Sequence, residues 1–129
     1  MEIPLRAALI DWLAQDAGLA AGLNSITEEA PAKASLPWLA IATSASADWS
    51  LKERAGREVR VAFELHCRGD RPDTAAALIA GVENRIAMLP RAQAIFELVS
   101  SQFLRARTEQ RPGNVRSILV EYRFRVLAA

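Results

Sequence analysis

The sequence predicts an α+β fold, in which an antiparallel β-sheet carries two α-helices packed on one of its faces. Apolar residues recur with helical spacing in two segments, and they alternate with polar residues in others. A turn-rich segment, residues 108–114, separates the last two extended segments and predicts a long C-terminal β-hairpin. With 129 residues, 51% of them hydrophobic, the chain has the size and composition of one folded domain spanning residues 1–129.

The first predicted helix begins close to Pro4, a residue that suits the first helical turn because its missing N–H is not needed there. Gly18 and Gly22 predict that this helix has ended and that a turn region follows. Five apolar residues occupy positions i, i+3, i+4, i+7 and i+8 and so share one face of the helix: Leu5, Ala8, Leu9, Trp12 and Leu13.

Residues 36–42 form a short apolar run that contains Pro37, which predicts a strand entered from a loop. Residues 44–57 are small, polar or charged, and they predict an exposed, mobile loop. Trp49 lies inside that segment, where the fold alone offers it little to pack against. Because exposed aromatic side chains often anchor protein partners, we expect Trp49 to contact one.

Residues 58–68 alternate strictly between apolar and polar side chains and predict a strand with one buried face. A break at residues 69–73 supplies a helix cap, and the second predicted helix follows Asp73 and ends before Pro90. The final two strands are predicted at residues 94–107 and 115–127. The pair Ser100–Ser101 marks a bulge or a change of face in the first of these.

Composition excludes several classes of protein. Sixteen basic and fifteen acidic residues give a net charge of +1, which disfavours a strongly basic nucleic-acid-binding protein. One cysteine and one histidine exclude an intramolecular disulfide and a Cys/His zinc site. The N-terminal sequence 1–6 lacks a basic signal-peptide region, and no apolar run approaches the ~18 residues of a membrane span, so we expect cytoplasmic synthesis and no membrane contact.

The sequence also lacks an arrangement typical of catalysis. His66 and Cys67 are neighbours in a predicted strand, so their side chains point to opposite faces and cannot form a base–nucleophile pair. No glycine-rich phosphate-binding loop is present. The close acidic pairs lie at loops or helix starts, where solvent or the helix dipole favours them: Glu28 with Glu29 and Asp70 with Asp73. We therefore predict that the protein is not an enzyme and needs no metal or cofactor.

Four arginines surround the predicted C-terminal hairpin: Arg105, Arg107, Arg111 and Arg116. They lack the interleaved aromatic residues of a nucleic-acid-binding surface. Arginine is enriched at protein–protein interfaces, so contact with a protein is favoured over contact with DNA. A hairpin tip that is simply solvated explains the same residues equally well.

Several segments together carry a resemblance to a known family. They are the helix sequence 5–13 followed by 16–19, the proline and apolar strand in 34–41, Asp48-Trp49-Ser50, the strand entry 56–59, the helix after Asp73 and the final hairpin with its arginine-containing strand. Together they resemble the small tail terminators, or tail completion proteins, of long-tailed phages, prophages and gene transfer agents. The resemblance covers nearly the whole chain and consists of residue types without a catalytic signature.

The resemblance implies a structural virion protein that forms a ring of six subunits and caps the tail tube. Such a ring ends tube polymerisation and offers a surface for head–tail joining. The implied partners are further copies of the chain, the tail tube protein and a head-side connector, with DNA passing through the lumen without specific binding. The implied location is the bacterial cytoplasm during assembly and then the head-proximal end of the tail.

Exposure and residue type, and not the resemblance, select the expected contact surfaces. They are the predicted loop with Asp48, Trp49, Lys52, Glu53 and Arg54 and the hairpin with Arg107 and Arg111. Two other classes remain open. One is another head–tail connector or tube-associated ring protein, which would not set tail length. The other is a small enzyme or ligand-binding domain, which would need a deep pocket with clustered ionisable groups.

Overall fold

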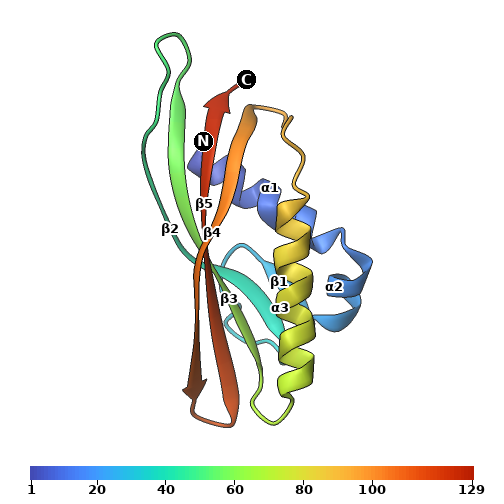
Figure 1. Cartoon of the computed structure of the whole chain (residues 1–129). Helices are drawn as coiled ribbons and strands as arrows, with labels where there is room; N and C mark the ends of the chain where they lie inside the picture. Colours follow the sequence, from blue (N-terminus) through green and yellow to red (C-terminus); the bar gives the residue numbers. More distant parts are fainter.

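The computed structural model describes residues 1–129 and contains three helices and five strands. Figure 1 shows one elongated sheet with the helices on one of its faces. The predicted α+β class and the C-terminal hairpin are confirmed, and a third, short helix is added. In chain order the elements are α1 (Glu2–Ala14), α2 (Ala17–Gly22), β1 (Ser25–Thr27), β2 (Trp38–Asp48), β3 (Gly56–Arg68), α3 (Pro72–Ala87), β4 (Phe96–Arg111) and β5 (Val115–Ala128).

The strands lie side by side in the order β1-β2-β3-β5-β4. Neighbouring strands are antiparallel except β1 and β2, which are parallel. The last strand of the chain, β5, therefore lies inside the sheet, between β3 and β4. Bulges interrupt β4 between Leu98 and Ser100 and between Phe103 and Arg105, so the irregularity predicted near Ser100 is confirmed.

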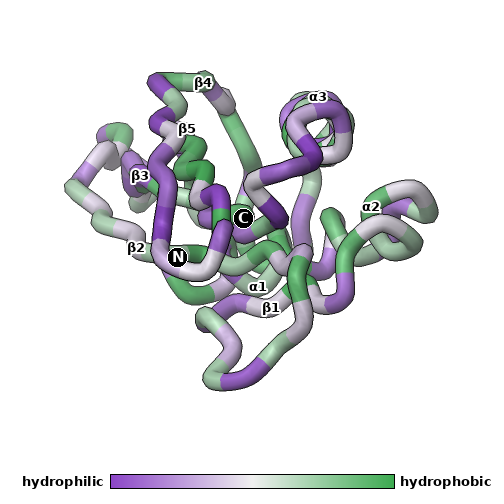
Figure 2. Tube along the Cα trace, turned by 90° about the horizontal axis from the view of Figure 1, so that it is seen from below, coloured by the Kyte–Doolittle hydropathy of each residue, from purple (hydrophilic) through white to green (hydrophobic).

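The core lies between the sheet and the helices. Leu5, Leu9 and Leu13 of α1 have no exposed surface, as their spacing predicts. Since burying a leucine side chain contributes roughly 1.5–3 kcal/mol, these three residues hold α1 on the sheet. The opposing residues alternate along the strands, and the best buried are Val59, Val61, Phe63 and Leu65 of β3 and Val120, Phe124 and Val126 of β5. Figure 2 shows hydrophobic and hydrophilic residues intermixed along the strands.

The prediction that residues 44–57 form one mobile loop is wrong. Strand β2 continues to Asp48 and β3 begins at Gly56, so that only residues 49–55 connect them. The small serines of this part of β2 are hydrogen-bonded to α1: Ser44 and Ser46 donate to the two carboxylate oxygens of Glu2 at 2.6 and 2.7 Å. These bonds lower the pKa of the Glu2 carboxyl group below its usual value.

The region predicted as a turn after the first helix contains two short elements. In α2, the Asp16 carboxylate caps the helix by accepting a hydrogen bond from the backbone N–H of Leu19 at 3.0 Å. β1 then pairs with Trp38–Ala40 of β2. Neither element could be predicted from the spacing of apolar residues, because both are too short to show a repeating pattern. α2 has six residues, two of them glycines, and β1 has three.

Helices α1 and α3 are joined by reciprocal hydrogen bonds. The indole nitrogen of Trp12 donates to the carbonyl of Arg85 at 2.8 Å, and Nε of Arg85 donates to the carbonyl of Trp12 at 2.9 Å. The guanidinium carbon also lies 3.4 Å from the centroid of the Trp12 ring, a cation–π contact. Trp12 is therefore packed as expected, and it joins the two helices.

Tyr122 is expected to titrate far above the ordinary range. Burial among aromatic side chains, together with the charge of Glu83, raises its pKa to about 12. Because the unfolded residue loses its proton near pH 10, stability is fully present below that pH and falls as pH rises towards 12. Tyr122 is the only tyrosine, so the ultraviolet absorbance of tyrosinate measures this residue alone. A midpoint near 10 in the folded protein would contradict its burial.

Candidate interaction surfaces

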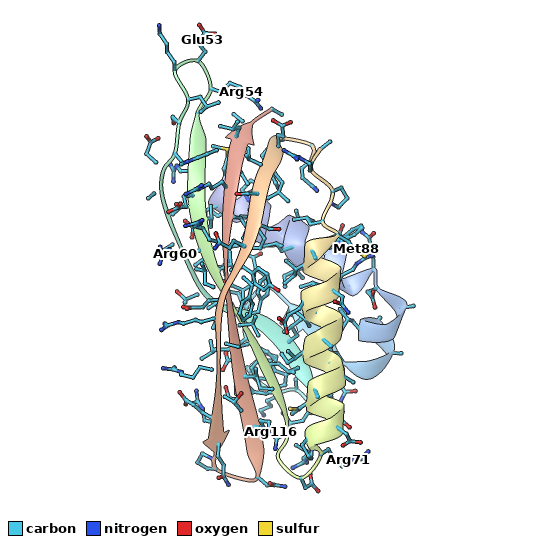
Figure 3. The ribbon with its side chains drawn as sticks, in the orientation of Figure 1. Glu53, Arg54, Arg60, Arg71, Met88 and Arg116 are labelled. Carbon is cyan, nitrogen blue, oxygen red and sulfur yellow. The ribbon has the colours of Figure 1, made fainter.

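The face of the sheet that points away from the helices is lined with charged residues in ion pairs. Glu58 accepts a hydrogen bond from Arg125 at 3.1 Å and lies 3.7 Å from Nε of Arg123. Arg105 pairs with Glu121, and this bond lowers the pKa of the Glu121 carboxyl group. Arg60, on the same face, points away from the helices in Figure 3. The face is thus polar and charged, with the character of a surface that meets solvent or another macromolecule.

Trp38, from the apolar run predicted as a strand, is buried on this charged face and not in the main core. Its ring stacks on that of His66 with 4.2 Å between centroids, and His66 contacts Glu64 at 2.5 Å. Cys67 points to the opposite face, where burial raises the pKa of its thiol. The structure thus separates the only histidine from the only cysteine, as predicted, and leaves the thiol a buried packing residue.

The connection 49–55 between β2 and β3 projects from one end of the sheet (Figure 1). It is an ordered turn, because the N–H of Leu51 donates to the carbonyl of Arg54 at 2.8 Å. Arg54 also donates to the carbonyl of Ala128 at 2.7 Å and to Glu97 at 3.1 Å, which ties the turn to the neighbouring strands. Lys52 and Glu53 are exposed at the tip, as expected, and Figure 3 shows Glu53 at the extreme end.

The placement of Trp49 differs from the expectation of an unsupported anchor. Its side chain is half-buried, and the guanidinium of Arg125 lies 5.4 Å from its ring centroid. Its backbone N–H donates to the carbonyl of Gly56 at 3.0 Å. Asp48, the last residue of β2, is exposed and accepts a hydrogen bond from Ser50 at 2.7 Å. Trp49 therefore closes the base of the hairpin and leaves only part of its ring to a partner.

Replacing Arg54 with alanine is expected to release the turn 49–55 without unfolding the sheet. The bonds lost are partly solvated, so the cost to global stability is at most about 1 kcal/mol. Amide hydrogen exchange should accelerate about fivefold in the turn, the kinetic equivalent of that energy. Lys52→Ala is the matched control, because Lys52 makes no hydrogen bond or ion pair. Equal amide exchange in the two variants would contradict the role of Arg54 in holding the turn to the neighbouring strands.

The residues expected at the C-terminal hairpin lie at the opposite end of the sheet. Arg107 contacts Glu109 at 3.0 Å, and Arg111 contacts the same carboxylate at 3.5 Å. Both arginine side chains are substantially exposed, at 65% and 44%. The structure therefore does not bring the two groups of expected contact residues together. It places one group at each end of the long axis, which Figures 1 and 3 show.

Among the cavities, one of about 230 Å³ on the charged sheet face is lined by Arg105, Arg107 and Glu121. The largest, of about 490 Å³, is an open groove between α2 and α3, with Asp16 and Asp73 as its only ionisable residues. No group of three His, Cys, Asp or Glu residues could hold a metal ion. No helix is long and apolar enough to cross a membrane.

Sequence reasoning missed one further surface, the two open edges of the sheet. From residue 99 onward β4 has no strand on its outer side, and its side chains are mostly exposed. Phe103 is 45% exposed there, although it is a large aromatic residue. The alternation of apolar and polar side chains does not encode strand order. Only the strand order distinguishes an edge strand from an inner strand.

Comparison with known proteins agrees with a role in assembly. A chain in the solved structure entitled "Virion of native gene transfer agent (GTA) particle" is similar to this one, with a TM-score of 0.79 and 26% sequence identity. The similarity covers 96% of this chain and 95% of that chain. Among curated proteins none matches significantly.

The fold and these surfaces, together with that similarity, define a structural component of phage-like tails. The model of the family described as "Tail completion protein gp17" matches residues 7–127. The chain therefore belongs to the tail completion protein gp17 family, and the expected resemblance is confirmed.

Proposed function

We propose that this protein is a tail terminator, which forms a ring of six subunits on the end of the tail tube and stops its polymerisation. The observation that carries the proposal is the match over nearly the whole of both chains to a component of a gene transfer agent virion. The family match over residues 7–127 supports the same role. Residues 1–129 then act as one tail-terminator-like domain, with no catalytic step and no cofactor.

The two projecting ends of the sheet fit a ring that must contact different partners on its two rims. If the ring axis runs roughly along the strands, the turn with Asp48, Trp49, Lys52, Glu53 and Arg54 lies on one rim, and Arg107 and Arg111 lie towards the other. One rim contacts the tail tube protein, and the other contacts the head-side connector. The separation of the two groups supports this assignment, because one continuous patch would serve only one partner.

The charged sheet face also suits a lumen through which DNA passes. Acidic groups on that face are paired with arginines, so it presents charges of both signs. DNA would move past such a surface without specific binding. The ring would be assembled in the bacterial cytoplasm and would remain at the head-proximal end of the tail, with no role for a membrane.

Deletion of the gene from its particle-producing cluster tests this function. We expect overlong or ragged tails that fail to join heads, measured by electron microscopy. Complementation with the intact gene should restore uniform, head-joined tails. Complementation with Lys52→Ala or with Arg54→Ala then tests whether the turn 49–55 forms one rim of the ring. The two variants differ because Arg54, unlike Lys52, is hydrogen-bonded to the neighbouring strands.

Two outcomes of the deletion would contradict the termination role. Headless tails of normal length would favour the alternative, a head–tail connector or tube-associated ring protein. Complete, infective or DNA-transferring particles would overturn the assembly role as a whole and return attention to the ligand-binding alternative.

A further inference from the structure

The sheet has two edges whose outward backbone groups are unpaired. On one side, β1 and the carbonyl of Glu28 pair with β2 only as far as Ile41, so residues 43–48 have an open edge. On the other side, β4 is paired outward only near its start, where the N–H of Leu98 donates to the carbonyl of Arg91. From residue 99 to residue 111 this edge is also open. Exposed edges of this kind readily pair with another strand.

The two open edges lie at the same level of the sheet. The register places four residues side by side across the four long strands, and such residues are level with one another: Ala45, Arg60, Arg123 and Gln102. In the same way, Ala47 is level with Ser100. The segment 100–103 lies between the two bulges of β4 and is regular. Residues 44–47 of β2 and residues 100–103 of β4 therefore lie at the same height on the two opposite edges of the sheet.

The strand directions also match. β2 and β5 run one way and β3 and β4 run the other. When copies are related by rotation about an axis along the strands, each keeps its direction. β4 of one copy then meets β2 of the next as an antiparallel neighbour, the pairing that the rest of the sheet uses. Such a contact joins two different surfaces and can close into a ring.

Each edge carries an exposed apolar side chain on the helix side of the sheet. Phe103 is 45% exposed and packs edge-on against Tyr122. It is level with Ser44, which is hydrogen-bonded to Glu2 of α1. Ile3, the residue after Glu2 in α1, is 73% exposed. Because a helix has 3.6 residues per turn, Ile3 lies on the side of α1 opposite Trp12 and so away from α3. Both apolar residues thus lie beside an open edge.

Side-chain size favours the same neighbour. The open part of β2 consists of small residues, Thr43-Ser44-Ala45-Ser46-Ala47, without the lysine or proline that commonly protects an edge. The charges beside it are of both signs, since Arg6 donates to Ser44 at 2.8 Å and Glu2 accepts from the same serine at 2.6 Å. The facing segment 100–103 of β4 is uncharged and carries the larger Phe103. An edge of small side chains leaves room for this larger one.

We propose that β4 of one copy pairs with β2 of the next copy as antiparallel strands, with residues 100–103 against residues 44–47, so that the sheet continues around the ring. This inference rests on the ring of the proposed function and specifies how its subunits are joined. It buries Phe103 and Ile3 at the contact and pairs the open segment of β2 with a regular stretch of β4.

Disulfide cross-linking in assembled particles tests the pairing. Ala45→Cys is combined in turn with Ser100→Cys, Gln102→Cys, Arg105→Cys or Arg107→Cys, which share a sheet face, so that a shift of register is covered. Within one copy, positions 45 and 102 are three strand spacings apart, about 14 Å, too far for a disulfide. Cys67 is buried in all variants.

We expect at least one double variant to give a ladder of oligomers on a non-reducing gel, while each single variant stays monomeric. A dimer from Gln102→Cys alone would overturn the proposal, because it would mean that two β4 edges meet. No cross-link in any double variant, with the protein present in particles, would also overturn it and leave the ring itself intact. Absence of the protein from wild-type particles would instead refute the proposed function.

A second pair of variants does not depend on register. Phe103→Glu should reduce incorporation into particles at least tenfold, while the purified chain keeps its circular dichroism spectrum and a cooperative unfolding transition. Met88→Glu is the control, because Met88 is 66% exposed at the end of α3, away from both edges. Equal incorporation of the two variants would overturn the proposal.

Discussion

Replacing Gly56 with alanine is expected to destabilise the protein by about 3 kcal/mol, near the upper end for overpacking a buried site. A Cβ at Gly56 would lie 2.8 Å from Cδ2 of Leu127 and 3.0 Å from the carbonyl oxygen of Val126, and closer still to the carbonyl oxygen of Trp49. Two of these three atoms belong to the backbone and cannot turn aside. The methyl group would therefore separate β3 from β5 or open the base of the β2–β3 hairpin.

Denaturant unfolding followed by circular dichroism measures this loss. Gly113→Ala is the matched control at the tip of the other hairpin, where no atom lies within 4 Å of the new Cβ. Gly113 has φ of +80°, so its replacement costs only backbone strain, about 1 kcal/mol. A loss at Gly56 no larger than that at Gly113 would mean that the close approach of Trp49 and Val126 does not constrain β3.

Phe124→Ala is expected to cost about 3–5 kcal/mol, the range for removing a buried aromatic ring. Phe124 has no exposed surface and stacks on Tyr122, with 5.8 Å between ring centroids. It belongs to β5, with strands on both sides, so neighbouring residues can fill little of the resulting cavity. The same unfolding experiment measures the effect.

Phe103→Ala provides the comparison, since the same side chain type is removed on the same side of the sheet. Phe103 is 45% exposed, so the isolated chain should lose no more than about 1 kcal/mol. A large loss from this substitution would show that Phe103 supports the fold of the single chain. Its exposure would then not be evidence for a partner surface.

The sequence predicted the elements whose side chains alternate or recur over a long stretch. The leucines of α1, the apolar stripe of α3 and the alternation in β3 and β5 are signals of burial, and the structure buries those residues. The end of β2 carried no such signal. Residues 44–48 form a strand because their backbone pairs with β3 and because Glu2 binds Ser44 and Ser46, contacts with a residue distant in sequence.

The contact surfaces were less predictable than the fold for a related reason. The exposure of Lys52, Glu53, Arg107 and Arg111 follows from residue type, and the structure agrees. That these residues lie at opposite ends depends on strand order and direction, which alternation does not encode. The same is true of the open edges. Phe103 is an aromatic residue of a type usually buried, and its place in the outermost strand leaves it exposed.

The position of β5 inside the sheet has a consequence for synthesis on the ribosome. β3 and β4 have no contact with each other except through β5, which is made after both. Until residues 115–128 have emerged, the nascent chain exposes one full edge of β3 and much of the apolar face that β5 later helps to bury. β2 and β3 can pair earlier, but β3 and β4 are joined into one sheet only after β5 has been made.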